Sequence, residues 1–326
     1  MSAEALNMAE VVGNYIKHRR APIAIPSEGG GYVLRYVPAI SGESVAHAYQ
    51  QWLAEEALKV GLKVCDWCRK GEMVKHGSRA ILEMEKLKRE AESVEEADLL
   101  EQIIIERCVV EDIGGFLVPT TVPVKRTSKF SVGYMIPALE DLKAASLDPQ
   151  FHVRHAPSLI GREKELGITE KGQAIYYVEL GSAIYTVSFT IDLDGIGQTS
   201  MVKIRNVITD NKELVQRKAV ALKALYYLLG GMLGAKRTRF LPDYELLSVI
   251  AAVVKGSIFN VSSGHRRNYI LNTATRAEQF TKLMGVKPNL LSLVKEGGVE
   301  IPRDVERAET LEEFTDRLLA LANVKL

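Results

Sequence analysis

The chain has 326 residues, of which 47% are apolar and 25% charged, with a formal net charge of +1. This length and apolar share suffice for a large core, in one elaborate domain or two ordinary ones. No apolar run of about 18 residues occurs, and residues 1–10 lack the features of a secretion signal, so neither a membrane span nor export is expected. Three cysteines argue against a disulfide framework and favour a cytoplasmic location.

Charge is segregated along the chain. Residues 83–112 hold 11 acidic and 4 basic residues, a net charge of −7, which leaves +8 on the remaining positions. Basic clusters stand out there: KHRR (17–20), KRTSK (125–129), AKRTR (235–239) and HRR (265–267). Concentrated Lys and Arg favour a phosphate backbone as partner, although cations on solvated faces also serve solubility alone.

The first third of the chain predicts a strand, a helix and a helical insertion. Residues 31–40 are rich in β-formers and follow a glycine-rich turn, so they predict a strand. Ser41 and Gly42 open a predicted helix to about Val60. Residues 62–112 carry apolar residues within a charged stretch and predict inserted helices.

The rest of the chain predicts mostly strands. Residues 114–139 are typical of a loop with short strands, and QFHVR at 150–154 predicts a further strand. Residues 173–193 form two β-rich runs joined by Gly181 and Ser182, either as a hairpin or as a bulge in one strand. The later elements are a helix over 212–229 stopped by Gly230 and Gly231, a strand from about Arg239, and a helix opened by the capping box Thr310 to Glu313.

This order of elements is compatible with an α+β fold whose sheet is of the ferredoxin-like kind. One face of such a sheet is open, and nucleic acid commonly lies there in RNA-recognition folds.

Catalytic motifs are not found in the sequence. GGMLGAKRT (230–238) approaches a P-loop, but that motif needs glycine at Ala235. No dinucleotide motif, nucleophile elbow or metalloprotease helix occurs. We therefore predict no catalytic residues, while an active site assembled from distant residues stays open.

A metal site is left open. Cys65 and Cys68 have the spacing of zinc ligands, and His76 and Cys108 could complete a tetrahedral site. The alternative is that the cysteines are ordinary thiols packed among helices. We predict no cofactor and no metal.

Five segments together identify a resemblance. NYIKHRRAP, YVPAISGESVAHAYQ, VKRTSKFSVGYMIPAL, QFHVR and GAKRTRFLP occur in the order found in the DevR family, the backbone subunit of the archaeal type I-A CRISPR Cascade surveillance complex. The resemblance covers about Ala3 to Val254. It implies a modified RNA-recognition-motif palm with a helical fingers insertion and a thumb loop. Such subunits polymerise along a CRISPR RNA without cleaving it.

The resemblance also implies a domain layout. The palm would comprise residues 1–61, 113–153 and 174–254, and the fingers residues 62–112. The thumb would be the polar loop 154–173, which in this family reaches the neighbouring subunit. Residues 255–326 would be a C-terminal extension packed on the palm.

The RNA-binding residues expected from the clusters and the resemblance follow one path. Ser41 and Gly42 would let the RNA backbone approach, and the free amides at Glu43 and Ser44 would donate to a phosphate. The remaining expected RNA contacts are Lys17, His18, Arg19, His47, Arg126, His152, Arg154, Lys236, Arg237 and Arg239. His47 and His152 have an alternative as satisfied core histidines. None reads a base edge, so target DNA would be recognised by pairing with the guide.

Two departures from the family pattern matter. The family normally has a strand before the segment that matches residues 3–7, and this chain starts at about the end of that strand. Related type III subunits cut RNA with an aspartate in the first palm loop, where this chain has Asn14, Lys17 and His18. We therefore expect a non-enzymatic subunit with copies of itself, other Cascade subunits and CRISPR RNA as partners, and no membrane. The rivals are a metal-dependent ribonuclease and a scaffold that binds only protein.

Overall fold

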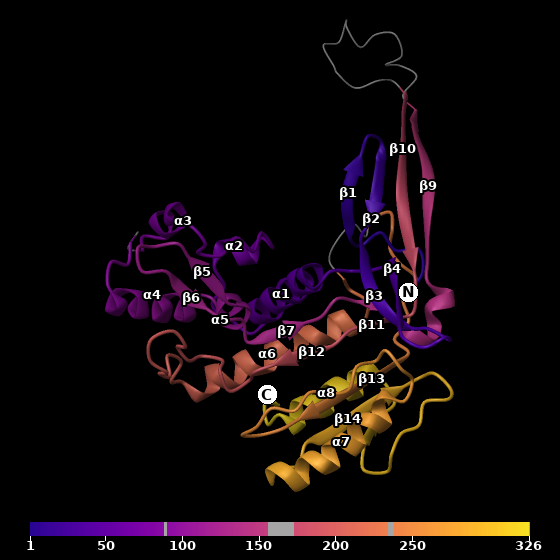
Figure 1. Ribbon diagram of the computed structural model, residues 1–326. Helices are drawn as coiled ribbons and strands as arrows, with labels where there is room; N and C mark the ends of the chain where they lie inside the picture. The colour runs from indigo at the N-terminus through magenta and orange to yellow at the C-terminus, as the bar shows by residue number, and fades with distance from the viewer. Residues whose placement is uncertain (88–89, 156–172, 234–237, 326) are drawn as a thin grey trace, which may run out of the picture.

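The computed structural model of the protein describes residues 1–87, 90–155, 173–233 and 238–325. It combines helices with several small sheets, which confirms the α+β class (Figure 1). No helix in these ranges is both long and apolar enough to cross a membrane. The predicted thumb loop, apart from the strand residues that flank it, lies outside the described residues.

A four-stranded sheet stands away from the body of the molecule (Figure 1). Its order is β1 (Met8–Val12), β2 (Tyr15–His18), β10 (Gln173–Ser182) and β9 (Ser146–His155). β9 and β10 pair antiparallel along all ten residues, and β2 runs parallel to β10. The predicted strand at 150–154 is thereby confirmed.

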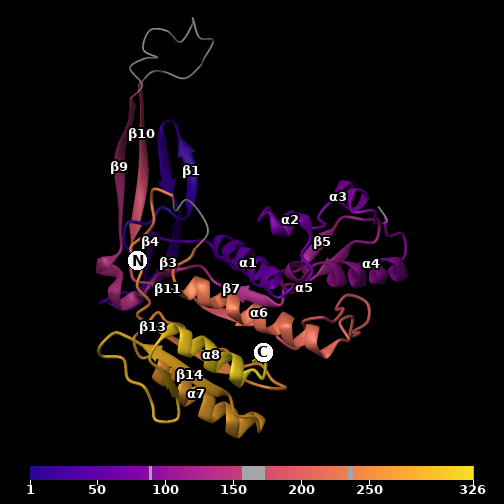
Figure 2. The same ribbon diagram turned by 180° about the vertical axis from the view of Figure 1, so that it is seen from behind.

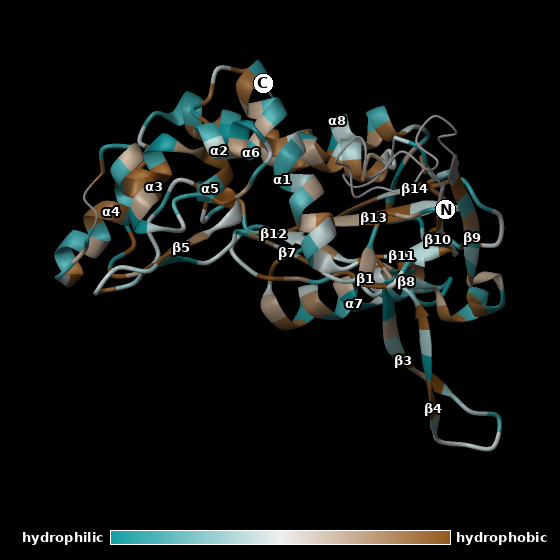
Figure 3. Ribbon diagram, turned by 90° about the horizontal axis from the view of Figure 1, so that it is seen from above, coloured by the Kyte–Doolittle hydropathy of each residue, from teal (hydrophilic) through white to brown (hydrophobic). Residues whose placement is uncertain are grey.

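A β-hairpin extends from the body in another direction. β3 (Arg20–Pro26) and β4 (Tyr32–Pro38) pair antiparallel, and Figure 3 shows them projecting beyond the other elements. Their tips carry exposed apolar side chains, including Tyr32 and Leu34. The predicted strand at 31–40 is confirmed as β4.

The main core lies between two long helices and two short sheets. α1 (Gly42–Lys59) packs against α6 (Asn211–Leu229), and the sheets pair β7 (Phe130–Val132) with β12 (Phe189–Ile191) and β8 (Ile136–Pro137) with β11 (Tyr185–Thr186). Tyr49 anchors this core. Its ring centroid lies 4.6 Å from that of Phe130 and 4.9 Å from that of Phe189, and its hydroxyl donates to the Ala221 carbonyl over 2.8 Å.

Residues 62–126 form a compact region that we call the helical unit. It contains α2 (Asp66–Arg69), α3 (Arg79–Met84), α4 (Val94–Arg107), α5 (Val109–Gly114) and a hairpin of β5 (Phe116–Val118) and β6 (Val124–Arg126). The predicted helices are therefore confirmed. Leu82, Leu100 and Ile104 share one apolar cluster with Phe116 and Val124, so this unit extends past the predicted boundary at residue 112.

The C-terminal region is a second α/β layer. β13 (Ser248–Val253) pairs with β14 (Asn289–Val294), which runs parallel to β15 (Glu306–Ala308). α7 (Tyr269–Met284) and α8 (Leu311–Leu321) flank this sheet, and α8 lies along α6, as Figure 2 shows from behind. β13 lies before the predicted division at residue 254 and its pairing partner β14 lies after it, so the sheet joins the two predicted parts.

Several predicted details change in the structure. Both β-rich runs around Gly181 were expected to form one hairpin or one bulged strand, which is wrong: β10 pairs with β9, and the second run supplies β11 and β12 to other sheets. The strand expected from about Arg239 begins at Ser248. A 3-10 helix at Leu139–Ala144 precedes β9. The helix caps are as predicted: Gly231 adopts φ +80°, and the Thr310 hydroxyl accepts a hydrogen bond from the Glu313 amide.

Candidate nucleic-acid interface

The basic segment at 17–20 is largely neutralised by acidic residues of the same chain. Lys17 Nζ lies 2.8 Å from Glu10 Oε1, and Arg20 Nη2 lies 2.6 Å from Glu179 Oε1. The Glu179 carboxylate also accepts hydrogen bonds from the Tyr15 hydroxyl and the His18 amide. These contacts tie β2 and β3 to β10, so the cations serve the fold as well as any ligand.

His18 is not available to RNA. Its side chain is fully buried, with Nε2 2.5 Å from Glu4 Oε1 and Nδ1 2.7 Å from the Arg19 carbonyl. Burial acts to lower the pKa of His18, but the hydrogen bond and charge of Glu4 outweigh it and raise that pKa above 6.5. The same pairing outweighs burial at Glu4 and lowers its pKa. The prediction of RNA contact by His18 is therefore wrong, because a buried ion pair already uses both ring nitrogens.

Arg19 differs from its neighbours. It is half-buried, it makes no ion pair within the described ranges, and its Nε is buried without a hydrogen-bond partner there. Its backbone amide donates to the Asn7 carbonyl over 2.8 Å, and the Asn7 side chain accepts from the Ser41 amide over 2.8 Å. Arg19 and the start of α1 therefore meet at Asn7. The structure thus brings together the basic cluster at 17–20 and the helix start at 41–43, both of which were predicted to contact RNA.

The start of α1 is a regular helix cap. The Ser41 hydroxyl accepts from the Ser44 amide over 3.3 Å, so the Ser44 amide expected to bind phosphate is already used. Glu43 is exposed in the first turn, where its charge favours the positive end of the helix. His47 is half-buried one turn later. RNA contact by Ser41, Glu43 and His47 stays a prediction.

Gly42 has a packing role. A Cβ at this position would lie 2.9 Å from the Val132 carbonyl oxygen, closer than real side chains approach. Glycine thus allows α1 to begin directly against β7. The sequence-based reason for this glycine, close approach of RNA, is therefore not needed to explain it.

Arg126 is the clearest correction among the predicted RNA contacts. Its side chain is fully buried, its Nη2 is ion-paired with Asp112 Oδ1, and its Nη1 lies 3.4 Å from Glu101 Oε1. Arg217 Nη1 approaches the same Asp112 carboxylate to 2.8 Å, and the Gly197 amide also donates to it. Arg126 is therefore a structural residue that joins β6 to α4, α5 and the loop before α6.

His152 lies on the four-stranded sheet among aromatic rings. Its ring centroid is 5.2 Å from that of Tyr176 in a stacked arrangement and 5.8 Å from that of Phe240. Its Nε2 is buried without a hydrogen-bond partner among the described atoms. Arg239, next to Phe240, is exposed. The structure therefore brings His152 near one end of the predicted basic loop, whose Lys236 and Arg237 lie outside the described residues, as does the side chain of Arg154.

Aromatic rings on both faces of this sheet were missed by the sequence reasoning. Tyr176 and Phe240 surround His152 on one face, while Phe151, Tyr177 and Tyr15 contact one another on the other. The available signal was a pair of adjacent ring residues in each strand, Phe151 with His152 and Tyr176 with Tyr177, because neighbouring residues in a strand point to opposite faces. Such rings can stack on nucleic-acid bases without reading sequence.

Three cysteines and a glutamate gather inside the helical unit. The potential ligand atoms of Cys65, Cys68, Cys108 and Glu111 all lie within 4.8 Å of one another, and all four residues are buried. His76, expected as a fourth ligand, instead directs Nδ1 to Glu111 Oε1 over 2.8 Å. The structure thus assembles the three expected cysteines and corrects the fourth member from His76 to Glu111.

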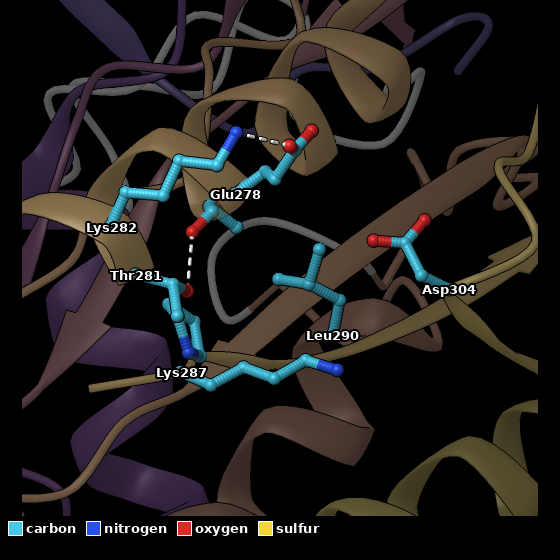
Figure 4. A pocket seen from close by; sticks show the side chains of 8 residues that line it. Glu278, Thr281, Lys282, Lys287, Leu290 and Asp304 are labelled. Atoms are coloured by element: carbon cyan, nitrogen blue, oxygen red, sulfur yellow. Dashed lines mark hydrogen bonds and ion pairs between the residues drawn. The ribbon is translucent and has the colours of Figure 1, made fainter. Parts of the chain in front are cut away.

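A surface pocket between α7 and β14 lies in the C-terminal region, away from these groups (Figure 4). It is lined by Glu278, Thr281, Lys282, Lys287 and Asp304 among others. Lys282 Nζ is paired with Glu278 over 2.7 Å, and the Thr281 hydroxyl donates to the Ala277 carbonyl. These contacts stabilise α7. Neither of them pairs a nucleophile with a general base.

Comparison of the chain with known protein families agrees with the resemblance that the sequence motifs indicate. A family model described as "CRISPR-associated negative auto-regulator DevR/Csa2" matches residues 1–274. The chain belongs to the DevR/Csa2 family. This confirms the predicted family.

Relatives in the DevR/Csa2 group match nearly the whole chain. The "CRISPR-associated aCascade subunit Cas7/Csa2 2" of Saccharolobus solfataricus is 35% identical over 322 residues, covering 98% of this chain and 96% of the relative. The "CRISPR-associated protein Cas7/Cst2/DevR" of Methanocaldococcus jannaschii is 26% identical and covers 83% of each chain. A chain of a solved "CRISPR RNA-guided surveillance complex" has a TM-score of 0.51 at 11% identity, covering 98% of this chain and 95% of the other, which shows a shared fold.

Proposed function

We propose that this DevR/Csa2 protein is a non-catalytic subunit that binds CRISPR RNA and forms the backbone of a type I-A Cascade complex. Copies assemble head to tail along the guide, since such heterologous contacts propagate without closing. Other Cascade subunits cap the filament, and target DNA is recognised by pairing with the guide. The four-stranded sheet and α1 belong to the ferredoxin-like palm, the helical unit is the fingers, and residues 154–173 are the thumb.

Arg19 is the observation that carries this proposal. Among the four residues at 17–20, the other three are each paired with a carboxylate, while Arg19 has none in the described part of the chain. It lies beside the N-terminus of α1, where the helix dipole favours an anion. A cation at this position suits a phosphate and carries no preference for base sequence.

The exposed sheet supports the other half of the proposal. Val11, Phe151 and Val153 are 67%, 55% and 47% exposed on β1 and β9. Apolar strands displayed in this way are typical of surfaces that contact another molecule. β4 contacts β9, the strand of His152, and pairs with β3, which begins directly after Arg19.

Salt-dependent RNA binding tests the proposal. In a filter assay with unrelated RNA sequences, affinity should fall steeply with salt and depend little on sequence. Arg19→Ala should weaken binding and reduce the salt slope by roughly 0.7, the value for one lost phosphate contact on a single strand. Replacing Lys236, Arg237 and Arg239 with Ala should weaken binding further.

A matched control removes three exposed cations of the C-terminal region, Lys255, Lys287 and Arg303. This triple variant should bind RNA as the unaltered protein does. Equal losses in both triple variants, or salt-insensitive binding, would refute a defined phosphate path. Labelled RNA incubated with divalent metal should remain uncut, and cleavage would instead favour the ribonuclease. RNA that fails to increase the oligomer size would favour the protein-only scaffold.

A further inference from the structure

The cysteine cluster of the helical unit is formed by segments far apart in the sequence. Cys65 is the N-cap of α2 and Cys68 lies within that helix, Cys108 separates α4 from α5, and Glu111 lies within α5. Their ligand atoms converge to within 4.8 Å of one another, and Cys65 Sγ lies 3.2 Å from Glu111 Oε1. These four are also all buried, so water does not compete for the space between them.

The dimensions fit one metal ion. Zinc prefers four tetrahedral ligands, and Zn–S bonds of about 2.3 Å place neighbouring sulfur atoms about 3.8 Å apart. The observed upper limit of 4.8 Å requires only a small contraction. Three thiolates with one harder ligand suit zinc, whereas calcium and magnesium prefer sites made of oxygen ligands.

The surroundings of the cluster resemble the outer shell of a metal site. His76 holds the Glu111 carboxylate through Nδ1 at 2.8 Å and through its backbone amide at 3.0 Å. Outer hydrogen bonds of this kind orient a ligand toward its metal. Lys75 Nζ donates to the Gly114 and Gly115 carbonyls over 3.0 and 2.6 Å, which places an amino group at the end of α5, the helix that carries Glu111.

We propose that Cys65, Cys68, Cys108 and Glu111 bind a structural zinc ion, with His76 positioning the Glu111 carboxylate. Binding releases the thiol protons, and the metal takes the place of the proton between Cys65 and Glu111. All four coordination positions are filled by protein, which is the pattern of a structural site and not of a catalytic one.

The ion would fasten the helical unit at its base. The segment of residues 60–78 follows α1, while Cys108 and Glu111 lie where α4 and α5 meet. The Val109 amide donates to the Lys63 carbonyl over 3.0 Å at the same junction. Zinc would add a second connection between these segments and fix how the helical unit is attached to α1. This role is independent of the proposed RNA binding.

Metal analysis of the full chain tests the proposal. Protein purified without chelator should contain close to one zinc per chain, released only after thiol modification or strong chelation. X-ray absorption at the zinc edge should show three sulfur ligands and one oxygen or nitrogen ligand. Substituted Co²⁺ should give the absorption bands of a tetrahedral thiolate site. These two measurements use the unaltered chain and do not depend on a variant that folds.

Variants identify the residues. Cys108→Ser should remove stoichiometric zinc, and His76→Gln should weaken zinc affinity by about 10- to 100-fold in competition with a chelator, as expected for an outer-shell partner. The matched control is Glu106→Gln, an exposed carboxylate close by in sequence, which should leave zinc binding unchanged.

Three outcomes would overturn the proposal. The first is that the reduced chain takes up no zinc from a metal buffer. The second is that the Cys108→Ser variant retains the full zinc content. The third is that the cysteines of freshly purified protein form a disulfide. Any of these would return the cluster to ordinary packed thiols.

Discussion

The helical unit is built around a buried charge network, whereas the four-stranded sheet has exposed apolar side chains on both of its edge strands. In the helical unit, Glu101, Asp112 and Arg126 are fully buried and satisfy one another. In the sheet, Val11 and Phe151 are more than half exposed. Buried charges that pair with one another stabilise the helical unit from within, whereas exposed apolar strands indicate contact with a further molecule. We propose that the four-stranded sheet is the part of the molecule that meets RNA or another copy.

The largest expected effect comes from opening the buried network. Arg126→Ala leaves the Asp112 and Glu101 carboxylates with fewer partners in a buried position, which should lower the free energy of unfolding by about 3–5 kcal/mol. Chemical denaturation measures this loss. Lys125→Ala, at the exposed neighbouring position, is the control and should stay within about 0.5 kcal/mol of the unaltered protein. A small effect of Arg126→Ala would mean that the charge network is not the centre of this unit.

A smaller effect, visible as a pH dependence, comes from the ion pair at the base of the sheet. The pKa of His18 is raised in the folded protein, so its contribution is present below pH 6.5 and is lost as pH rises through the raised value. The pKa of Glu4 is lowered, so its contribution is present above pH 4.5 and is lost as pH falls through the lowered value. Both contributions are complete between these values.

His18→Gln should remove the alkaline part of this profile. The unaltered protein should lose stability as pH rises above 6.5, because the raised pKa of His18 means that the folded state holds this proton more tightly than the unfolded state does. Denaturation at several pH values measures the curve. A variant that keeps the same alkaline decline would show that another group is responsible.

The smallest effect on stability is expected from a substitution on β1, the exposed edge strand of the four-stranded sheet. Val11→Ser should change the free energy of unfolding by less than about 0.5 kcal/mol, because the side chain is 67% exposed. It should nevertheless shorten assemblies on a guide-length RNA, measured by mass photometry. Val178→Ala, buried in the same sheet, should show the reverse, with lower stability and unchanged assembly length once folded. Equal assembly by Val11→Ser would exclude this edge of the sheet as a contact.

The sequence could predict elements that depend on local signals. The strand before Ser41, the helix that follows it and the caps at Gly231 and Thr310 need only neighbouring residues, and the structure has them. The pairing of the strands around Gly181 depends on distant segments and was mispredicted.

The predictions of site residues were wrong where the interaction partner of the side chain lies elsewhere in the sequence. Nothing near Arg126 in the sequence indicates Gly195 or Gln198, whose carbonyls it also reaches. His18 looked like a basic surface residue because its partner Glu4 lies 14 positions earlier. The acidic stretch at 83–112 shows in the sequence only as a local excess of negative charge, yet Asp98, Glu101, Glu111 and Asp112 are buried. The cysteine spacing was informative, but Glu111 was hidden among many other acids.

Asp112 has a consequence for how the protein unfolds. Its two carboxylate oxygens accept from Arg126 of β6, Arg217 of α6 and the Gly197 amide, so three separate segments depend on one side chain. Opening any of them exposes the same charge, which makes independent local opening costly. Amide protons in α5 and α6 should then exchange with solvent at similar, slow rates, as parts of a single cooperative block.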